Sequence, residues 1–258
     1  GKDRMMGRDS FFTLLRRHRL MLPPPKPRHT TNSNHRYHKW KNLIHGFEPM
    51  AANQLWVADI TYIMLNNGDV CYLHLITDAY SRMIVGWELA DTLRATITIK
   101  ALEQAISQTG GVSLEGLIHH SDRGVQYCCD DYVRTLKTHE IKISMTEDYN
   151  PTDNAIAERA NGVIKTETVY SRKTFNSLEH ARNVIGRFIH FYNYRRPHMS
   201  IGYKIPAVVH TETGPQKKMW KKKNYTKNMY NNGNNGISLS CRTTGADDGC
   251  NHHTVYPI

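Results

Sequence analysis

Residues 54–90 read QLWVADITYIMLNNGDVCYLHLITDAYSRMIVGWELA, three apolar runs separated by turn-forming residues. The Asn-Asn-Gly-Asp tetrapeptide at 66–69 favours a hairpin because Asn and Gly tolerate a positive φ, so we expect three successive antiparallel strands. Downstream, residues 92–108 and 127–140 have helical spacing, and 114–122 and 141–145 are short strand-like runs. With the helix expected after residue 150, this order predicts an α/β fold with a mixed five-stranded sheet and helices on both faces. Residues 8–22 and 177–198 predict two further amphipathic helices.

Three carboxylates lie where these elements end or begin. Asp59 interrupts the first apolar run, Asp122 follows the run LIHHS, and Glu158 lies inside the helical segment NPTDNAIAERANGVIKTE. Carboxylates that a fold brings together repel one another unless a proton or a cation intervenes. Oxygen ligands without nearby Cys or paired His favour magnesium or manganese over zinc. The three residues therefore predict a divalent-metal site.

Other roles are open to single acidic residues. An Asp at a strand end is more often a turn former or a helix cap, and only the conjunction of three favours a metal site. Asp78, in LITDAYS, also ends an apolar run and is the strongest rival to Asp59. Asp153 and Asn154 precede the helix of Glu158, and we expect one of them to be its N-cap, so we assign Asp153 to structure. His120, two residues before Asp122, shares its strand face, although packing is the favoured role for this histidine.

The motifs WVADITYI, HSDRGVQY and DNAIAERANGVIKTE occur in this order, and 35 residues (123–157) separate Asp122 from Glu158. Together they resemble the retroviral integrase superfamily and, more narrowly, the OrfB-type insertion-sequence transposases of the IS3 family. The resemblance covers about residues 50–210, including FIHFYNYRRPHMSIGYKIPA near its end. It implies an RNase H-like catalytic core.

The resemblance also implies an activity. Asp59, Asp122 and Glu158 would bind two Mg²⁺ ions, with Mn²⁺ as an alternative, and catalyse DNA strand cleavage and strand transfer. Partners would be the element ends and target DNA, together with further copies of the chain. Two other interpretations remain open: an RNase H-like nuclease that does not join DNA, and an inactive DNA-binding relic.

Five residues are candidate DNA contacts. Lys165 follows Glu158 by two helical turns and shares its face, although a solvated helix face is the alternative. Arg123 lies in the turn of HSDRGVQY, where Gly124 would let a DNA backbone approach. In KKMWKKKNY (217–225), lysines alternate with aromatic residues, a pattern suited to phosphate attraction and base stacking. The candidates there are Lys218, Trp220 and Lys221.

The net charge of +11 is unevenly distributed. Residues 1–50 contain 11 basic and 3 acidic side chains, residues 51–214 contain 16 and 18, and residues 215–258 contain 7 and 2. We expect a basic arm with a short helix at 1–50, a catalytic core at 51–212, and a basic, then Asn/Gly-rich tail at 213–258. Basic arms would hold the core on a polyanion, although they would also serve solubility alone.

The five cysteines form no CxxC pair, which favours a reducing compartment. Cys241, Cys250, His252 and His253 match no standard zinc-finger spacing and are assigned to the tail. No stretch approaches the roughly eighteen apolar residues of a membrane span. We expect a cytoplasmic, nucleoid-associated protein.

Overall fold

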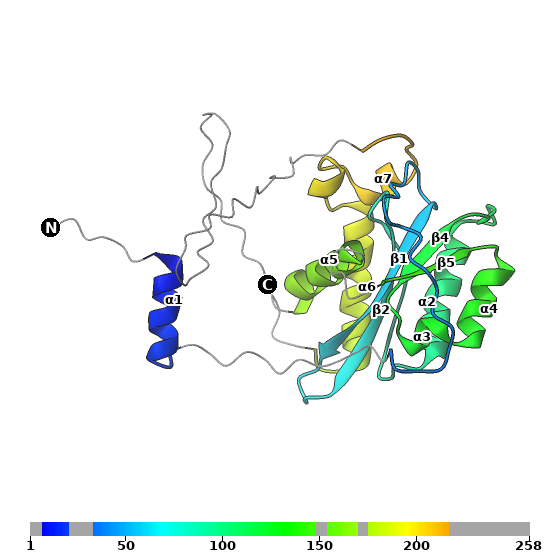
Figure 1. The fold of residues 1–258 in the computed structure, drawn as a ribbon. Helices are drawn as coiled ribbons and strands as arrows, with labels where there is room; N and C mark the ends of the chain where they lie inside the picture. Colours follow the sequence, from blue (N-terminus) through cyan, green and yellow to red (C-terminus); the bar gives the residue numbers. More distant parts are fainter. Residues whose placement is uncertain (1–6, 21–32, 148–153, 170–174, 217–258) are drawn as a thin grey trace, which may run out of the picture. The chain divides into compact units, whose positions relative to one another are not determined.

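The computed structural model describes residues 7–20, 33–147, 154–169 and 175–216. Its centre is a five-stranded sheet in the order β3-β2-β1-β4-β5 (Figure 1). β1 pairs antiparallel with β2, and β2 with β3, whereas β4 is parallel to both β1 and β5. This topology confirms the predicted mixed sheet. The strands are β1 (Leu55–Met64), β2 (Val70–Asp78), β3 (Ile84–Ala90), β4 (Ile118–Ser121) and β5 (Lys142–Met145).

The hairpin predicted at 66–69 joins β1 to β2. Gly68 adopts a φ of 86°, which a glycine tolerates without strain, and the amide of Leu65 donates to the carbonyl of Asp69 over 2.9 Å. β1 is longer than β4 and pairs with it only through Leu55–Val57. The remainder of β1 therefore extends beyond the paired region.

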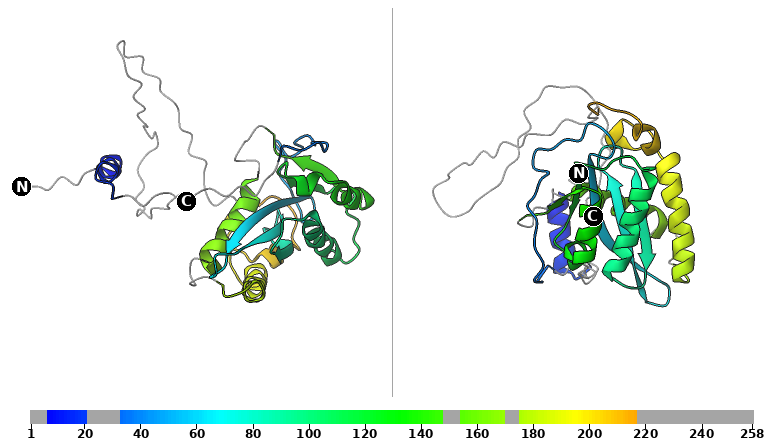
Figure 2. Two further views of the ribbon diagram at one scale, coloured as in Figure 1. Left: turned by 90° about the horizontal axis from the view of Figure 1, so that it is seen from below. Right: turned by 90° about the vertical axis from the view of Figure 1, so that its right-hand side faces the viewer.

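Side chains of β1 alternate between the two faces of the sheet, and helices cover both (Figures 1 and 2). Trp56, Ala58 and Ile60 pack in a core cluster with residues of α2, α3 and α4. Ile63 and Leu65 belong to a second cluster with α5 and α6 on the other face. The helices are α1 (Arg8–Arg17), α2 (Ala95–Gln108), α3 (Val125–Cys128), α4 (Asp130–Thr138), α5 (Ala155–Ile164), α6 (Leu178–Tyr194) and α7 (Pro206–Val209), with a π-helical turn η1 (Lys165–Val169) and a 3₁₀ turn η2 (Met199–Ile201).

Two helices differ from the sequence-based expectation. The predicted continuous helix at 127–140 is wrong, because the extended residue Cys129, with a ψ of 151°, separates α3 from α4. The helix after residue 150 passes into the π-helical turn η1 at Lys165, where the side chain of the buried Thr168 donates to the carbonyl of Ile164. α6 begins as expected, since the hydroxyl of Ser177 accepts a hydrogen bond from the amide of His180.

The segment before β1 lies against the core. Trp40 packs on the cluster beneath α4, and Ile44 packs on a smaller cluster that includes Val57. The amide of Leu43 donates to the hydroxyl of Ser144 in β5 over 2.8 Å.

The predicted domain boundaries at residues 50 and 212 stay predictions. Among the described residues, no helix is both long enough and apolar enough to cross a membrane.

Candidate active site

Sheet register brings the two candidate aspartates level with each other. The parallel pairing of β1 with β4 matches Val57 with His120, so two further residues along each chain bring Asp59 beside Asp122. Asp122 directly follows Ser121, the last residue of β4, and both aspartates are partly buried. The pKa of Asp59 is raised to about 7, mainly by burial and also by the negative charges of Asp122 and, more weakly, Glu158.

Asn161 on α5 is the direct partner of Asp59. Its Nδ2 donates to Asp59 Oδ2 over 2.7 Å, and this hydrogen bond opposes the rise of the Asp59 pKa. Asn154, the N-cap residue of α5, donates from its own Nδ2 to the carbonyl of Ala58 over 3.2 Å. These two asparagines attach α5 to β1 at the candidate site. The sequence indicated Asn154 only as one of two candidate caps, and the structure makes it the N-cap residue. Asn161 was missed, although Asn154, Glu158, Asn161 and Lys165 recur at intervals of four, three and four residues along one helix face.

Glu158 lies in the first turn of α5 with an exposed side chain. It is close enough for its charge to act on Asp59. However, no three His, Cys, Asp or Glu side chains in the described parts of the chain are grouped tightly enough to hold a metal ion. The three carboxylates are therefore electrostatic neighbours that have not closed around a common centre.

The turn after Asp122 is held from two sides. Asp122 Oδ1 accepts a hydrogen bond from the amide of Gly124 over 2.9 Å. From the segment before β1, His35 Nε2 lies 2.9 Å from the carbonyl oxygen of Arg123. Arg123 itself is partly buried, and its Nε has no acceptor among the described residues.

Lys165, at the junction of α5 and η1, has its Nζ 4.3 Å from the centre of the Tyr62 ring. Burial lowers the pKa of Lys165, and the negative charge of Asp59 partly offsets that effect. The ammonium group therefore lies beside the aspartates rather than on a fully solvated face. Its predicted contact with phosphate stays a prediction.

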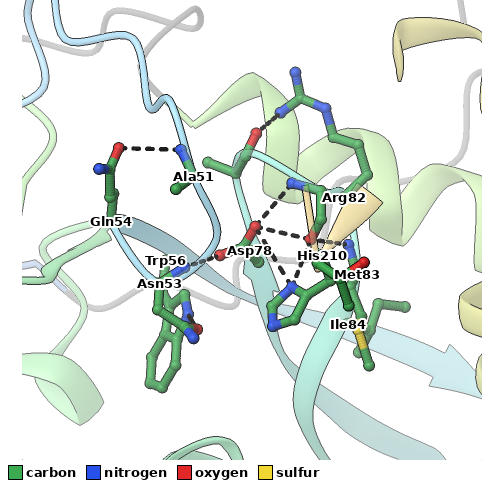
Figure 3. Close-up of polar contacts among 12 residues, drawn as sticks. Ala51, Asn53, Gln54, Trp56, Asp78, Arg82, Met83, Ile84 and His210 are labelled. Atoms are coloured by element: carbon green, nitrogen blue, oxygen red, sulfur yellow. Dashed lines mark hydrogen bonds and ion pairs between the residues drawn. The ribbon is translucent and has the colours of Figure 1, made fainter. Parts of the chain in front are cut away.

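Asp78, the rival carboxylate, has a structural role at the end of β2 (Figure 3). It is fully buried, and its Oδ2 accepts from the amide of Asn53 over 2.8 Å. Its Oδ1 accepts from both the amide and the hydroxyl of Ser81, each over 2.8 Å, and Ser81 in turn lies 2.9 Å from Nδ1 of His210. The side-chain partners of Asp78 are Asn53, Ser81 and, at 3.9 Å, His210, and they do not include Asp59 or Asp122.

The two histidines of β4 are packing residues. His119 is buried against Tyr127 and Tyr132, and the Tyr132 hydroxyl lies 2.9 Å from His119 Nε2. Burial lowers the pKa of His119 to about 3, so this ring is neutral. His120 is also buried, with its Nδ1 2.8 Å from the hydroxyl of Ser144 on β5.

Several residues singled out from the sequence lie outside the described residues. They are Asp153, Lys218, Trp220, Lys221 and the Cys/His residues of the tail.

Two family models, both described as integrase core domain, match residues 49–151 and 139–206. Transposase InsF of insertion sequence IS3A from Escherichia coli is 32% identical over 168 residues, which are 64% of this chain and 57% of InsF. A 31 kDa protein of insertion element IS600 from Shigella sonnei is 38% identical over 206 residues, 79% of this chain and 74% of that protein. The chain belongs to the IS3 family of insertion-sequence transposases.

Other members of the family match a shorter region. The putative transposase of IS986/IS6110 from Mycobacterium tuberculosis is 38% identical over 165 residues, 63% of this chain. The matched region spans only 59% of that transposase. The chain therefore spans less than two thirds of the length of that transposase and of InsF.

Solved structures confirm the RNase H-like fold. The catalytic core domain of HTLV-2 integrase, described in complex with magnesium, aligns with a TM-score of 0.50 at 20% identity, covering 63% of this chain and 99% of that domain. A chain of the simian T-cell lymphotropic virus intasome aligns with a TM-score of 0.55 at 18% identity, covering 82% of this chain and 73% of its own length. These two likenesses concern the fold alone.

Proposed function

We propose that this chain carries the catalytic part of a DDE-type transposase, which cleaves DNA strands and transfers them to a target in a metal-dependent reaction. The observation that carries the proposal is the coupling of three carboxylates from separate elements. Asp59 has a pKa of about 7 because it is buried and because Asp122 and Glu158 add negative charge around it. Such a grouping is costly for folding and is typical of a functional site.

The donor set fits hard divalent cations. Asp59, Asp122 and Glu158 offer only oxygen ligands, which suits Mg²⁺ or Mn²⁺, and we propose two ions per site. When bound, the ions would activate the attacking oxygen and stabilise the leaving oxygen at a phosphodiester. Binding also requires the Glu158 carboxylate to approach the aspartates, which its exposed and rotatable side chain permits.

The remaining residues would position the reactants. Asn161 holds the Asp59 carboxylate in one orientation through its 2.7 Å hydrogen bond. Lys165 would contact a phosphate next to the carboxylates, and Arg123 would contact the backbone at the turn after Asp122. Lys218, Trp220 and Lys221 would attach the arm after the core to DNA by charge and stacking.

The substrates would be the ends of the element and a target DNA. Joining two ends needs two active sites, so we propose a homo-multimer assembled on DNA. The simian relative is described as part of an intasome, which accords with such an assembly. A protein acting on the bacterial chromosome would work in the cytoplasm at the nucleoid.

A strand-transfer assay with labelled DNA ends taken from the sequences that flank the gene tests the proposal. Glu158→Gln keeps the size of the side chain and removes its charge, so we expect DNA binding within about twofold of the parent and joining reduced by roughly a hundredfold or more. The matched control is Glu179→Gln, since Glu179 is also an exposed glutamate in the first turn of a helix. It should join DNA normally.

Two results would contradict the proposal. Undiminished joining by the Glu158→Gln variant would remove Glu158 from the site. Metal-dependent degradation of ends with free 3′-hydroxyl groups, without joined products, would instead identify a nuclease.

A further inference from the structure

A pocket of about 550 Å³ lies at the outer edge of the sheet, beside β5. It is bounded by residues 38–43, by the last turn of α4 and by the start of β5. Its apolar lining comes from Trp40, Leu43, Ile141 and Ile143. Leu43 is 43% exposed, so apolar surface remains open to a ligand here.

Four lysines surround this apolar lining. Lys39, Lys41, Lys137 and Lys142 all line the pocket and all are exposed. Acidic residues are absent from the lining. Within the described parts of the chain none of the four lysines forms an ion pair. The pocket therefore presents a concentrated positive charge that is complementary to an anionic ligand.

Trp40 gives the pocket an aromatic surface. The ring packs against the core cluster below α4, which fixes its position. Lys137 Nζ lies 5.3 Å from the centre of the ring, and His38 meets the ring edge-on at 4.7 Å. A partly exposed indole next to exposed lysine side chains is an arrangement that can stack a nucleobase while the lysines contact phosphate.

None of the three carboxylates of the candidate active site lines the pocket. β4 and β5 are parallel, and Asp122 follows the C-terminal end of β4, whereas Ile141–Ile143 lie at the N-terminal end of β5. Lys41 and Leu43 contact the C-terminal half of β5, since the Lys41 carbonyl accepts from the amide of Met145 over 3.4 Å and the Leu43 amide donates to the Ser144 hydroxyl over 2.8 Å. The pocket therefore runs along β5. A ligand here would not displace groups from the three carboxylates.

We propose that this pocket, which we call the Trp40 pocket, binds single-stranded DNA, with one unpaired base stacked on Trp40 and the flanking phosphates held by the four lysines. The inference rests on the proposed action on DNA and adds a second contact, to an unpaired strand away from the reacting phosphate. An acidic peptide would use the lysines but would leave the indole without a stacking partner. A duplex would keep its bases stacked on one another.

The test is fluorescence anisotropy with a labelled twelve-nucleotide oligothymidine and the full chain, in the presence of a metal chelator. Lys137→Gln/Lys142→Gln should weaken binding and reduce the slope of log K against log salt by about 1.4, since each phosphate contact on a single strand contributes about 0.7. The charge-matched control is Lys100→Gln/Arg187→Gln, two exposed residues on α2 and α6. The control should leave the slope unchanged if these residues do not contact the strand.

Trp40→Ala should weaken binding by roughly tenfold to a hundredfold through loss of stacking, and Trp40→Phe by only about threefold. Because Trp40 packs on the core, the alanine variant can lose stability, and the phenylalanine and lysine variants then decide the matter. Photo-crosslinking with 5-iododeoxyuridine in the oligonucleotide should label the peptide that contains Trp40.

Equal binding by the lysine pair variant and its control would overturn the inference, as would crosslinks confined to other peptides. The preference for an unpaired strand would also be overturned if the lysine and Trp40 variants weakened binding to duplex DNA as much as binding to the oligothymidine. These outcomes are independent of catalysis. If the chain binds the oligonucleotide through the pocket but does not join DNA, the proposed function alone is refuted. If the chain joins DNA normally and the pocket variants bind like the control, this inference alone is refuted.

Discussion

Asp59 is held in an environment that disfavours its charge. Burial, together with the neighbouring carboxylates, raises its pKa from 3.8 to about 7. In the unfolded chain the same group ionises near its ordinary pKa. Between pH 4 and pH 7 the folded protein therefore holds a proton that the unfolded chain has released. This contribution makes the metal-free protein less stable as the pH rises across that window, and it is constant above pH 7.

Asp59→Asn should therefore stabilise the metal-free protein at pH 8 by about 1–2 kcal/mol, a value reduced to allow for solvent screening of a partly exposed side chain. The gain in stability should be smaller at pH 5. The amide replaces an ionised carboxylate with a neutral group of the same shape. Thermal unfolding with a chelator at the two pH values measures the effect. Asp91→Asn, at an exposed position, is the control. A stability gain that is the same at both pH values would show that the charge is not its cause.

Asn161→Ala should raise the pKa of Asp59 further, because it removes the hydrogen bond that favours the charged form. The acid limb of the pH profile for strand transfer should move to higher pH, and metal affinity should fall roughly tenfold, as is typical for partners of metal ligands. Asn183→Ala on the exposed face of α6 is the control. A lower rate with an unmoved pH profile would assign Asn161 a purely structural role.

The sequence singled out Asp59, Asp122 and Glu158, although Asp59 lies in the middle of β1 and not at a strand end, and it did not predict their supporting residues. Asn is common at helix caps and in turns, so Asn154 and Asn161 attracted no functional interpretation. Only the three-dimensional structure shows that the side chain of the N-cap residue Asn154 donates to the carbonyl of Ala58 and makes no capping hydrogen bond to its own helix.

At the scale of elements, α2 lies unusually close to β3. A Cβ added at Gly86 would lie 2.1 Å from the carbonyl oxygen of Ala101 and 3.0 Å from the Cβ of Ala105. The obstructing carbonyl belongs to the helix backbone, which cannot move without shifting α2. The small residues at this contact allow the helix to cover the antiparallel half of the sheet.

Gly86→Ala should destabilise the protein by about 1–3 kcal/mol or more, since overpacking a tight contact forces the backbone to shift. Denaturant unfolding measures this change. Gly162→Ala is the control, because nothing lies within 4 Å of a Cβ placed there in α5. That replacement should stabilise the helix by about 0.5–1 kcal/mol. Similar effects for the two variants would contradict the close approach of α2.

The strands were predictable because alternation and the hairpin signal at 66–69 agree. The break between α3 and α4 was not, since no Gly or Pro marks it, and Cys129 is extended in the folded chain. Nor does any local signal mark the π-helical turn after Ile164. Both features depend on packing against other elements, which a single sequence does not display.

At the scale of the whole molecule, the charge distribution separates a near-neutral core from basic flanking segments. In the full chain, Lys218→Gln/Lys221→Gln should weaken the salt dependence of duplex binding. The slope of log K against log salt should fall in magnitude by about 1.8, since each phosphate contact contributes about 0.9. Lys100→Gln/Arg187→Gln again serves as the charge-matched control. Filter binding across a salt series measures both slopes. Equal slopes for the two variants would show that these lysines are not phosphate contacts.

The central claim is that Asp59, Asp122 and Glu158 share one divalent-cation site. Fe²⁺ substituted for the natural ion, with ascorbate and peroxide, generates radicals that cut the backbone next to the ligands. We expect cuts near residues 59, 122 and 158 together, suppressed by excess Mg²⁺ and lost in the Asp122→Asn variant. Cuts near only one of these residues, or a pattern unchanged by that substitution, would contradict it.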